Sequence, residues 1–211
     1  RAWWRDLWRG PKAKLEFARA SLLAERGIGT VEPLAWGRFA GRWPSGSFLL
    51  TRELTATIPL DEYLLAFTGD VCTRHRFTRA LAGFLKQLHT AGVVHPDLHP
   101  GNILVRVENN GWQFFLLDLH DLVLGAPLTL PERRANLVLF NRWFRLRCSA
   151  TERLRFWLAY LFAPEEREVA KAIELDTLAS DLELWQSRDS RCLRNNRHFR
   201  VVSTATTTGY A

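Results

Sequence analysis

The stretch His95-Pro96-Asp97-Leu98-His99-Pro100-Gly101-Asn102, followed by Leu116-Leu117-Asp118, carries the strongest structural signal in this chain. Between the two motifs, residues 103–107 and 112–117 predict two strands joined by a turn at 108–111. Opposed residues in such a hairpin have numbers that add up to about 219 to 221. Because Asn102 and Asp118 add up to 220, we expect them side by side at the open end of the hairpin, with Asp97 just outside.

The polar side chains at this open end match the chemistry of Mg-ATP phosphoryl transfer. A carboxylate at Asp97 is free to accept a proton from a hydroxyl group. Asn102 and Asp118 carry hard oxygen donors that can share a magnesium ion. Such residues near a turn often only cap loops, but the amphipathic helix before them and the buried strand that ends in Asp118 favour a catalytic loop.

Hydrophobic spacing predicts most of the remaining elements. A strong amphipathic helix over 74–90 places Phe77, Leu81, Phe84, Leu85 and Leu88 on one face. Further helices are predicted over 13–26, 131–147, 151–162 and 165–188, followed by an arginine-rich stretch to about residue 200. Short strands are predicted over 29–36 and 47–51, with a turn region over 41–46, and residues 203–211 are expected to form a tail.

Composition limits the class of protein. The 211 residues are 47% hydrophobic and 12% aromatic, which is enough for a real core but short for a complete two-lobed kinase. No apolar run is long enough to predict a membrane span. Cys72, Cys148 and Cys192 are odd in number and far apart, which argues against a disulfide framework or a zinc site and favours a reducing cytosol.

The second half of the chain is basic and aromatic, and the net charge is +7. Any single arginine is expected to pair with a carboxylate on a solvated face, but as a set they indicate contact with anions such as phosphates. The phosphates of RNA would pair with these arginines equally well. We expect the nine tryptophans in the core and at interfaces rather than as a base-stacking platform, so nucleic acid is not the expected partner. The residues concerned are Arg142, Trp143, Arg145, Arg147, Arg153, Arg155, Trp157, Arg188, Arg191, Arg194, Arg197 and Arg200.

These motifs resemble the protein-kinase-like superfamily. Within it, the chain is similar to the bacterial lipopolysaccharide kinase group, which includes the Kdo and heptose kinases and InaA-like proteins. The subgroup resemblance rests on residues 3–7, 12–17, 118–120, 136–143 and 191–197. It implies an α+β, protein-kinase-like fold: a truncated N-lobe over 1–54, a mostly helical C-lobe with the catalytic hairpin over 55–202, and a tail over 203–211.

The resemblance also implies residue roles. Asp97 would orient or deprotonate the acceptor hydroxyl, while Asn102 and Asp118 would hold Mg²⁺ against the phosphates of ATP. His95 would support the loop without reacting. His99 would contact the γ-phosphate or a sugar hydroxyl, or only satisfy backbone groups. Nucleotide contacts are expected from Glu16, which resembles the helix-C glutamate, and from Glu53 and Leu54, at the expected hinge between the lobes.

Two departures from the protein-kinase pattern stand out. Asp118-Leu119-His120 replaces Asp-Phe-Gly, so no glycine-dependent flip is expected. The sequence has no Gly-rich loop and no strand lysine ahead of Glu16, and Lys12 and Lys14 are too close to Glu16 to act from a facing strand. Since the chain contains no methionine, we expect a fragment whose phosphate-binding lysine precedes Arg1, and such a fragment is expected to bind nucleotide weakly or to be inactive.

The expected activity is ATP- and Mg-dependent phosphorylation of a Kdo or heptose hydroxyl in the lipopolysaccharide core. The expected partners are a core sugar or lipid A precursor and an anionic inner-membrane surface, reached from the cytoplasmic side as a peripheral protein. Two alternatives stay open: a small-molecule kinase of the aminoglycoside or choline type, and a nucleotide-binding pseudokinase. The sequence does not predict an oligomeric state.

Overall fold

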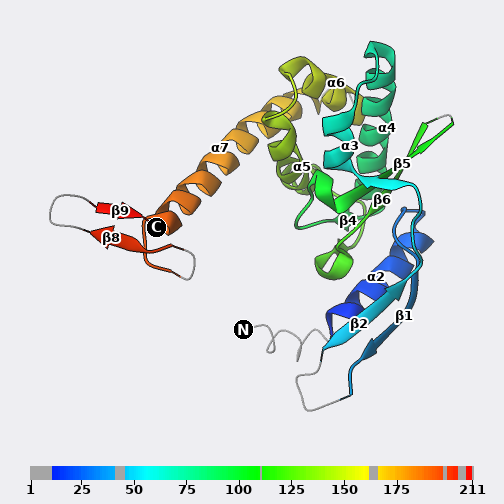
Figure 1. Cartoon of the computed structure of the whole chain (residues 1–211). Helices are drawn as coiled ribbons and strands as arrows, with labels where there is room; N and C mark the ends of the chain where they lie inside the picture. The colour runs from blue at the N-terminus through cyan, green and yellow to red at the C-terminus, as the bar shows by residue number, and fades with distance from the viewer. Residues whose placement is uncertain are drawn as a thin grey trace.

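The computed structural model describes residues 11–40, 46–109, 111–161, 166–196, 199–203 and 208–210. The motif over 3–7 and most of the expected turn over 41–46 therefore lie outside the described residues, as do Asn110 and Arg197. Figure 1 shows one helix and a two-stranded sheet at the N-terminal end, a helical body around a second sheet, and a long helix that leads to a final hairpin.

The N-terminal part consists of helix α2 (Lys12–Glu25) and strands β1 (Pro33–Arg38) and β2 (Ser47–Thr51). The helix ends before Gly27, whose φ of 71° suits glycine, so the predicted helix is confirmed to within one residue. The first strand begins later than predicted because Gly29 and Thr30 bond to Leu116 of the catalytic hairpin instead: the Leu116 N–H donates to the Gly29 carbonyl at 2.8 Å, and the Thr30 hydroxyl donates to the Leu116 carbonyl at 2.7 Å.

The next segment contains one helix that the sequence analysis missed. Strand β3 (Thr57–Pro59) leads directly into α3 (Leu60–Ala66), and α4 follows over Val71–Thr90. Helix α4 begins three residues before the predicted start because the Asp70 carboxylate caps it, accepting from the Thr73 N–H at 2.7 Å. The predicted boundary after residue 54 falls between β2 and β3, and the division into lobes stays a prediction.

The predicted hairpin is present as β5 (Ile103–Glu108) and β6 (Gly111–Leu116). Ile103 pairs with Leu116 and Glu108 with Gly111, so the numbers of each pair add up to 219, within the predicted range. Strand β3 pairs with the other edge of β5, which gives the order β3-β5-β6. A two-residue connection sets this register.

The C-terminal half is helical, as predicted, but its end differs. It consists of α5 (Leu130–Arg145), α6 (Ala150–Tyr160) and α7 (Arg167–Cys192). Capping boxes start α5 at Thr129 and α6 at Ser149. The expected tail instead contains a hairpin, in which β8 (Val201–Ser203) pairs with β9 (Thr208–Tyr210).

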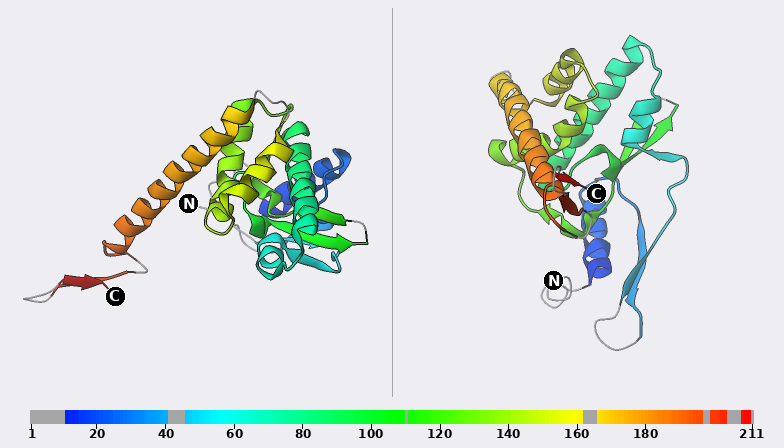
Figure 2. Two further views of the ribbon diagram at one scale, coloured as in Figure 1. Left: turned by 90° about the horizontal axis from the view of Figure 1, so that it is seen from above. Right: turned by 60° about the vertical axis from the view of Figure 1, so that its left-hand side comes forward.

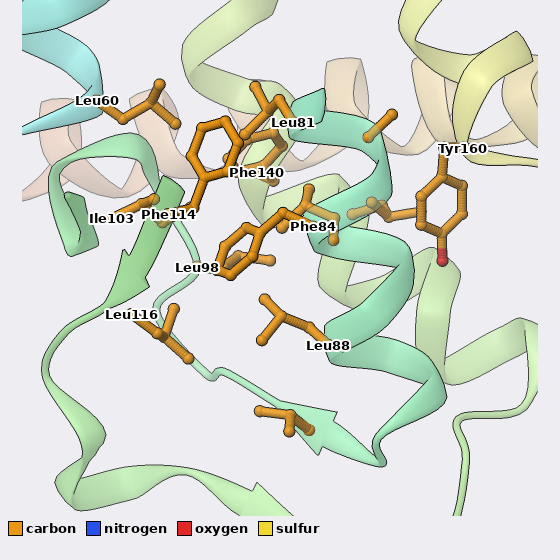
Figure 3. Close-up of a cluster of buried hydrophobic side chains, with 14 of the residues drawn as sticks. Leu60, Leu81, Phe84, Leu88, Leu98, Ile103, Phe114, Leu116, Phe140 and Tyr160 are labelled. Carbon is orange, nitrogen blue, oxygen red and sulfur yellow. The ribbon is translucent and has the colours of Figure 1, made fainter. Parts of the chain in front are cut away.

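The core lies between α4, the hairpin and α5, as the close-up in Figure 3 shows. All five residues of the predicted α4 face are buried, which confirms the periodicity argument. Phe84 stacks on Phe114 of β6, with the ring centroids 5.3 Å apart. Leu98, within the predicted catalytic motif, and Ile103, directly after it, are also buried in this core. Apolar side chains therefore anchor the loop in its middle and at its C-terminal end.

Several arginines of the expected basic surface hold α7 in place instead. Arg142 and Arg145 both approach Asp181, at 3.1 and 3.5 Å. Arg153 bonds to Glu174 at 3.0 Å, and the buried Trp157 donates its indole N–H to the same carboxylate. The expectation that a single arginine pairs with a carboxylate is confirmed for these three arginines, so their charge is already neutralised by α7. Among the remaining arginines, Arg147, Arg155, Arg188, Arg191, Arg194 and Arg200 are exposed.

Helix α7 extends well past the helices on which it packs. Figure 2 shows its C-terminal half and the β8–β9 hairpin standing away from the rest of the described chain. No helix in the described ranges is both long enough and apolar enough to cross a bilayer.

Candidate active site

The predicted catalytic loop connects the short strand β4 (Val93–Val94) to β5 and ends in a turn of 3-10 helix over Pro100–Asn102. The backbone N–H of Asn102 donates to the His99 carbonyl at 2.9 Å. The side-chain amide of Asn102 donates to the Asp97 carbonyl, also at 2.9 Å. This bond turns the amide so that its N–H is used within the loop, and the side-chain oxygen accepts no hydrogen bond from any residue in the described ranges.

Asp118 lies next to the loop because the hairpin continues one step beyond its last pair. The Leu117 N–H donates to the Asn102 carbonyl at 2.9 Å. The two arms of the hairpin therefore stay hydrogen-bonded up to the residue before Asp118. Asp118 itself adopts the left-handed conformation, with φ 53° and ψ 57°, which for a non-glycine residue is uncommon and found preferentially at functional sites. The structure thus brings Asn102 and Asp118 to the same end of the hairpin.

Asp97 presents its carboxylate to solvent at this end. Its side chain is 72% exposed, and the Nε2 of His99 lies 3.6 Å from the Asp97 Oδ2. The other ring nitrogen of His99 accepts from the Gly101 N–H at 3.1 Å. His99 therefore does satisfy a backbone group, one of the alternatives that the sequence left open, while its Nε2 points toward the candidate base.

His95 is buried beneath the loop. Its Nδ1 accepts from the Asp97 N–H at 3.1 Å, so its Nε2 carries the hydrogen and donates to the Leu117 carbonyl at 2.9 Å. Burial lowers the pKa of His95 despite the nearby carboxylates, which keeps the ring neutral. His95 thus joins Asp97 to the residue before Asp118, and this geometry fits the supporting role expected of it.

Asn136 of α5 fixes the backbone of His95, and the sequence analysis assigned it no role. Its side-chain amide donates to the His95 carbonyl at 2.6 Å, and its side-chain oxygen accepts from the His95 N–H at 3.4 Å. The same oxygen lies 3.2 Å from Nε2 of His89, whose Nδ1 lies 2.7 Å from the Tyr160 hydroxyl. The side chains of His89, His95, Asn136 and Tyr160 are almost fully buried. Their contacts form a buried polar network that links α6 to the loop.

The burial of His89 predicts a pH dependence of stability. Burial lowers the pKa of His89 to about 4, against about 6.5 for an unfolded chain. Between these values the unfolded state binds more protons, so the free energy of unfolding should fall by up to about 3 kcal/mol as the pH drops through this window. Urea unfolding at a series of pH values measures the slope. His89→Gln should flatten it, and an unchanged slope in that variant would contradict the assignment.

Two further residues touch Asp118 and were not assigned to it from the sequence. His120 places Nδ1 2.6 Å from the Asp118 Oδ1 and Nε2 3.1 Å from the Asp121 Oδ2. Lys12, at the start of α2, places its ammonium 3.7 Å from the same oxygen of Asp118. The sequence analysis considered Lys12 only in relation to Glu16 and missed this contact, because it depends on how α2 packs against the end of the hairpin.

The three expected nucleotide residues do not share one site in the structure. Glu16 lies at a cavity of ≈ 250 Å³ between α2, β2 and the end of β6, together with Leu49 and Leu117. Glu53 and Leu54 lie in the connection between β2 and β3 and do not line that cavity. A larger cavity of ≈ 490 Å³ lies among α3, α4, α5 and α6 and contains no residue of the catalytic loop, so cavity size does not locate the chemistry.

The donor set at the end of the hairpin fits magnesium. Mg²⁺ in phosphoryl-transfer sites binds one or two protein oxygens and completes its shell with phosphates and water. Asn102 offers an unused amide oxygen and Asp118 a carboxylate that is partly exposed. The described residues include no group of three or more His, Cys, Asp or Glu side chains that could hold a metal alone. A catalytic loop and hairpin of this kind define a phosphotransferase of the kinase class.

Comparison with known proteins defines the family. The sequence profile of the lipopolysaccharide kinase (Kdo/WaaP) family matches residues 3–157, most of the chain, so the chain belongs to this family of kinases. Among solved structures, "WaaP in complex with acyl carrier protein" matches with a TM-score of 0.63 and 21% identity over 79% of this chain and 76% of that one. At this identity the likeness shows a shared fold. No curated protein sequence matches the chain.

Proposed function

We propose that this kinase transfers the γ-phosphoryl group of ATP, with Mg²⁺, to a Kdo or heptose hydroxyl of the lipopolysaccharide core. The family supports lipopolysaccharide as the acceptor class. The observation that carries the proposed chemistry is the bond from the Leu117 N–H to the Asn102 carbonyl. It joins the two motifs at one end of the hairpin, which supports a shared site for the Asp97 carboxylate, the Asn102 amide oxygen and the Asp118 carboxylate.

Asp97 is the proposed base. Its exposed carboxylate can receive the proton of an acceptor hydroxyl as that oxygen attacks the phosphorus atom. His95 holds the Asp97 backbone through the bond to its N–H. His99, 3.6 Å from the Asp97 carboxylate, is placed to contact either a sugar hydroxyl or the transferred phosphoryl group, and both are part of the proposal.

Asn102 and Asp118 are the proposed magnesium ligands. When bound, the ion would neutralise charge on the phosphate oxygens of ATP. Asn102 keeps its side-chain oxygen available because its N–H is already bonded to Asp97. His120 holds one oxygen of Asp118, which orients the carboxylate. Glu16, Glu53 and Leu54 remain the proposed nucleotide contacts.

The proposed acceptor also suits the exposed arginines. Guanidinium groups bind phosphate in a bidentate manner, and phosphorylated core sugars or a lipid A precursor carry such groups. Arg147 and Arg155 lie on the helical half, and Arg188, Arg191 and Arg194 lie at the end of α7. This charge further supports a peripheral position at the anionic cytoplasmic face of the inner membrane.

A transfer assay tests the proposal. The protein is incubated with ATP labelled at the γ-phosphate and with defined core oligosaccharides that end in Kdo or in heptose, with Mg²⁺ or with a chelator. We expect label on one of the two sugars only when Mg²⁺ is present. Label on neither sugar, under conditions in which Mg-ATP binding is measurable by calorimetry, would overturn the proposed acceptor.

A further inference from the structure

Helix α7 carries an apolar stripe that no described part of the chain covers. Leu175, Leu178, Leu182 and Trp185 are 68%, 37%, 53% and 50% exposed. Their spacing of three, four and three residues places them on one face of the helix. The helix packs on α5 and α6 through a different set, which includes Ile173, Thr177 and Asp181. The stripe is therefore a second apolar face of α7. Figures 1 and 2 show that the C-terminal half of this helix projects from the body.

Charged residues extend this stripe at both ends with the same spacing. Lys171 lies four residues before Leu175, and Asp189 lies four residues after Trp185. The whole series, from Lys171 to Asp189, follows the alternating three- and four-residue steps of a coiled-coil seam. Both end residues are exposed. Lys171 forms an exposed ion pair with Glu168 of its own helix, at 2.9 Å, and such a surface pair contributes little to stability.

The order of residues along the stripe is self-complementary. Lys171 and Asp189, Leu175 and Trp185, and Leu178 and Leu182 are three pairs whose residue numbers each add up to 360. Two copies of α7 that run antiparallel in this register would place each pair in contact. Leucine would meet leucine at the centre, leucine would meet tryptophan on either side, and lysine would meet aspartate at both ends.

We propose that this protein forms a dimer in which the α7 helices of two copies pair antiparallel about a two-fold axis near residue 180. Such an axis requires one surface that complements itself, and the stripe has both the apolar centre and the opposite charges that this demands. The projecting half of each α7 would lie along the half that packs on the partner's body. The pairing would bury the stripe of both copies.

The pattern favours a second copy over a lipid surface. A helix that lies on an anionic bilayer carries a broad apolar face flanked by basic residues. Here the stripe is narrow, and Asp189 lies within it, where it would face the lipid headgroups. In the antiparallel pair the same aspartate faces Lys171 of the other copy. The charges of the stripe therefore favour a second copy of the chain over a lipid surface as its binding partner.

Sedimentation velocity over a concentration series tests the dimer. We expect the 24.3 kDa chain to sediment as a dimer, and we expect Leu182→Glu to sediment as a monomer with an unchanged far-UV circular dichroism spectrum. The matched control is Leu146→Glu, which should leave the dimer intact. Leu146 is another exposed leucine, at 64% against 53% for Leu182, and lies just after α5. A monomeric wild-type chain throughout the series, or a dimer indifferent to Leu182→Glu, would overturn the proposal.

A charge exchange tests the antiparallel register. Lys171→Glu and Asp189→Lys should each weaken the dimer, since each places like charges together at both ends, and the double variant should restore it. In a parallel pair each residue would meet its own copy, so neither single change nor the double change would have this pattern. Failure of the double variant to restore the dimer would overturn the register.

Vesicle binding tests the alternative that the stripe binds a membrane surface. Co-sedimentation with phosphatidylglycerol vesicles should be unaffected by Leu182→Glu if the stripe is a dimer surface. A monomeric chain that binds these vesicles, and loses binding with Leu182→Glu, would overturn the dimer and assign the stripe to the membrane. These measurements do not depend on catalysis, so their outcome is distinct from that of the transfer assay.

Discussion

Replacing Asp97 by asparagine is expected to lower kcat for phosphoryl transfer by about 10²- to 10⁴-fold, because the reaction loses its proton acceptor. The amide keeps the size of the side chain but cannot take the proton. The carboxylate is exposed, and its distance to the His99 ring is 3.6 Å, so the stability of the fold should hardly change. Steady-state transfer to the preferred core oligosaccharide measures kcat, and urea unfolding measures the stability.

A matched control for this variant is available on the same hairpin. Glu108→Gln makes the same chemical change at an exposed residue at the far end of β5, and it should leave kcat unchanged. If Asp97→Asn retains full turnover while its unfolding midpoint also matches the wild type, Asp97 is not the base. A loss of turnover together with a loss of Mg-ATP affinity would instead indicate a role in binding the metal.

Replacing Asn136 by leucine should cause the largest loss of stability, about 3 to 5 kcal/mol. Leucine is close to asparagine in size but removes every hydrogen bond of the amide. The N–H and carbonyl of His95 and the Nε2 of His89 would lose their bonds to Asn136, and each unpaired buried polar group costs about 1 to 3 kcal/mol. The expected result is a lower midpoint of urea unfolding at pH 7.

The control for this second variant is Asn109→Leu, an asparagine exposed near the turn of the hairpin. It should change the free energy of unfolding by less than about 0.5 kcal/mol. If Asn136→Leu also changes the free energy of unfolding by less than about 0.5 kcal/mol, the buried polar side chains do not hold the loop. Because His95 contacts both Asp97 and Leu117, the loss of Asn136 should also reduce transfer in the fraction of protein that stays folded.

The elements that sequence patterns predicted are those whose signals are local. The hairpin register followed from the position of its turn, and the buried face of α4 followed from the spacing of its five apolar residues, all buried in the structure. Helix α3 was missed because its seven residues are too few for a clear periodicity. The ends of α4 and α7 differed from prediction by a few residues, since caps and tertiary contacts set helix ends.

In the candidate site, too, local patterns predicted some contacts and missed others. Asp97, Asn102 and Asp118 were predicted together because one hairpin carries all of them, and the Leu117 to Asn102 bond now joins the motifs. The contacts of Lys12 with Asp118 and of Asn136 with His95 were not predicted. Each joins residues far apart in the sequence, and no local pattern marks which lysine or asparagine will reach the loop.

The arginines show most clearly what the sequence alone could not decide. Their number and the net charge of +7 are properties of the sequence, and so are the chemistry of the catalytic motif and the pairing of its strands, because neighbours along the chain determine them. Only the packing of α5, α6 and α7 decided that Arg142 and Arg153 neutralise Asp181 and Glu174, while the apolar stripe of α7 stays exposed. The angle and depth at which helices pack depend on the whole core, so an amphipathic sequence predicts that a face will be covered but not which element will cover it.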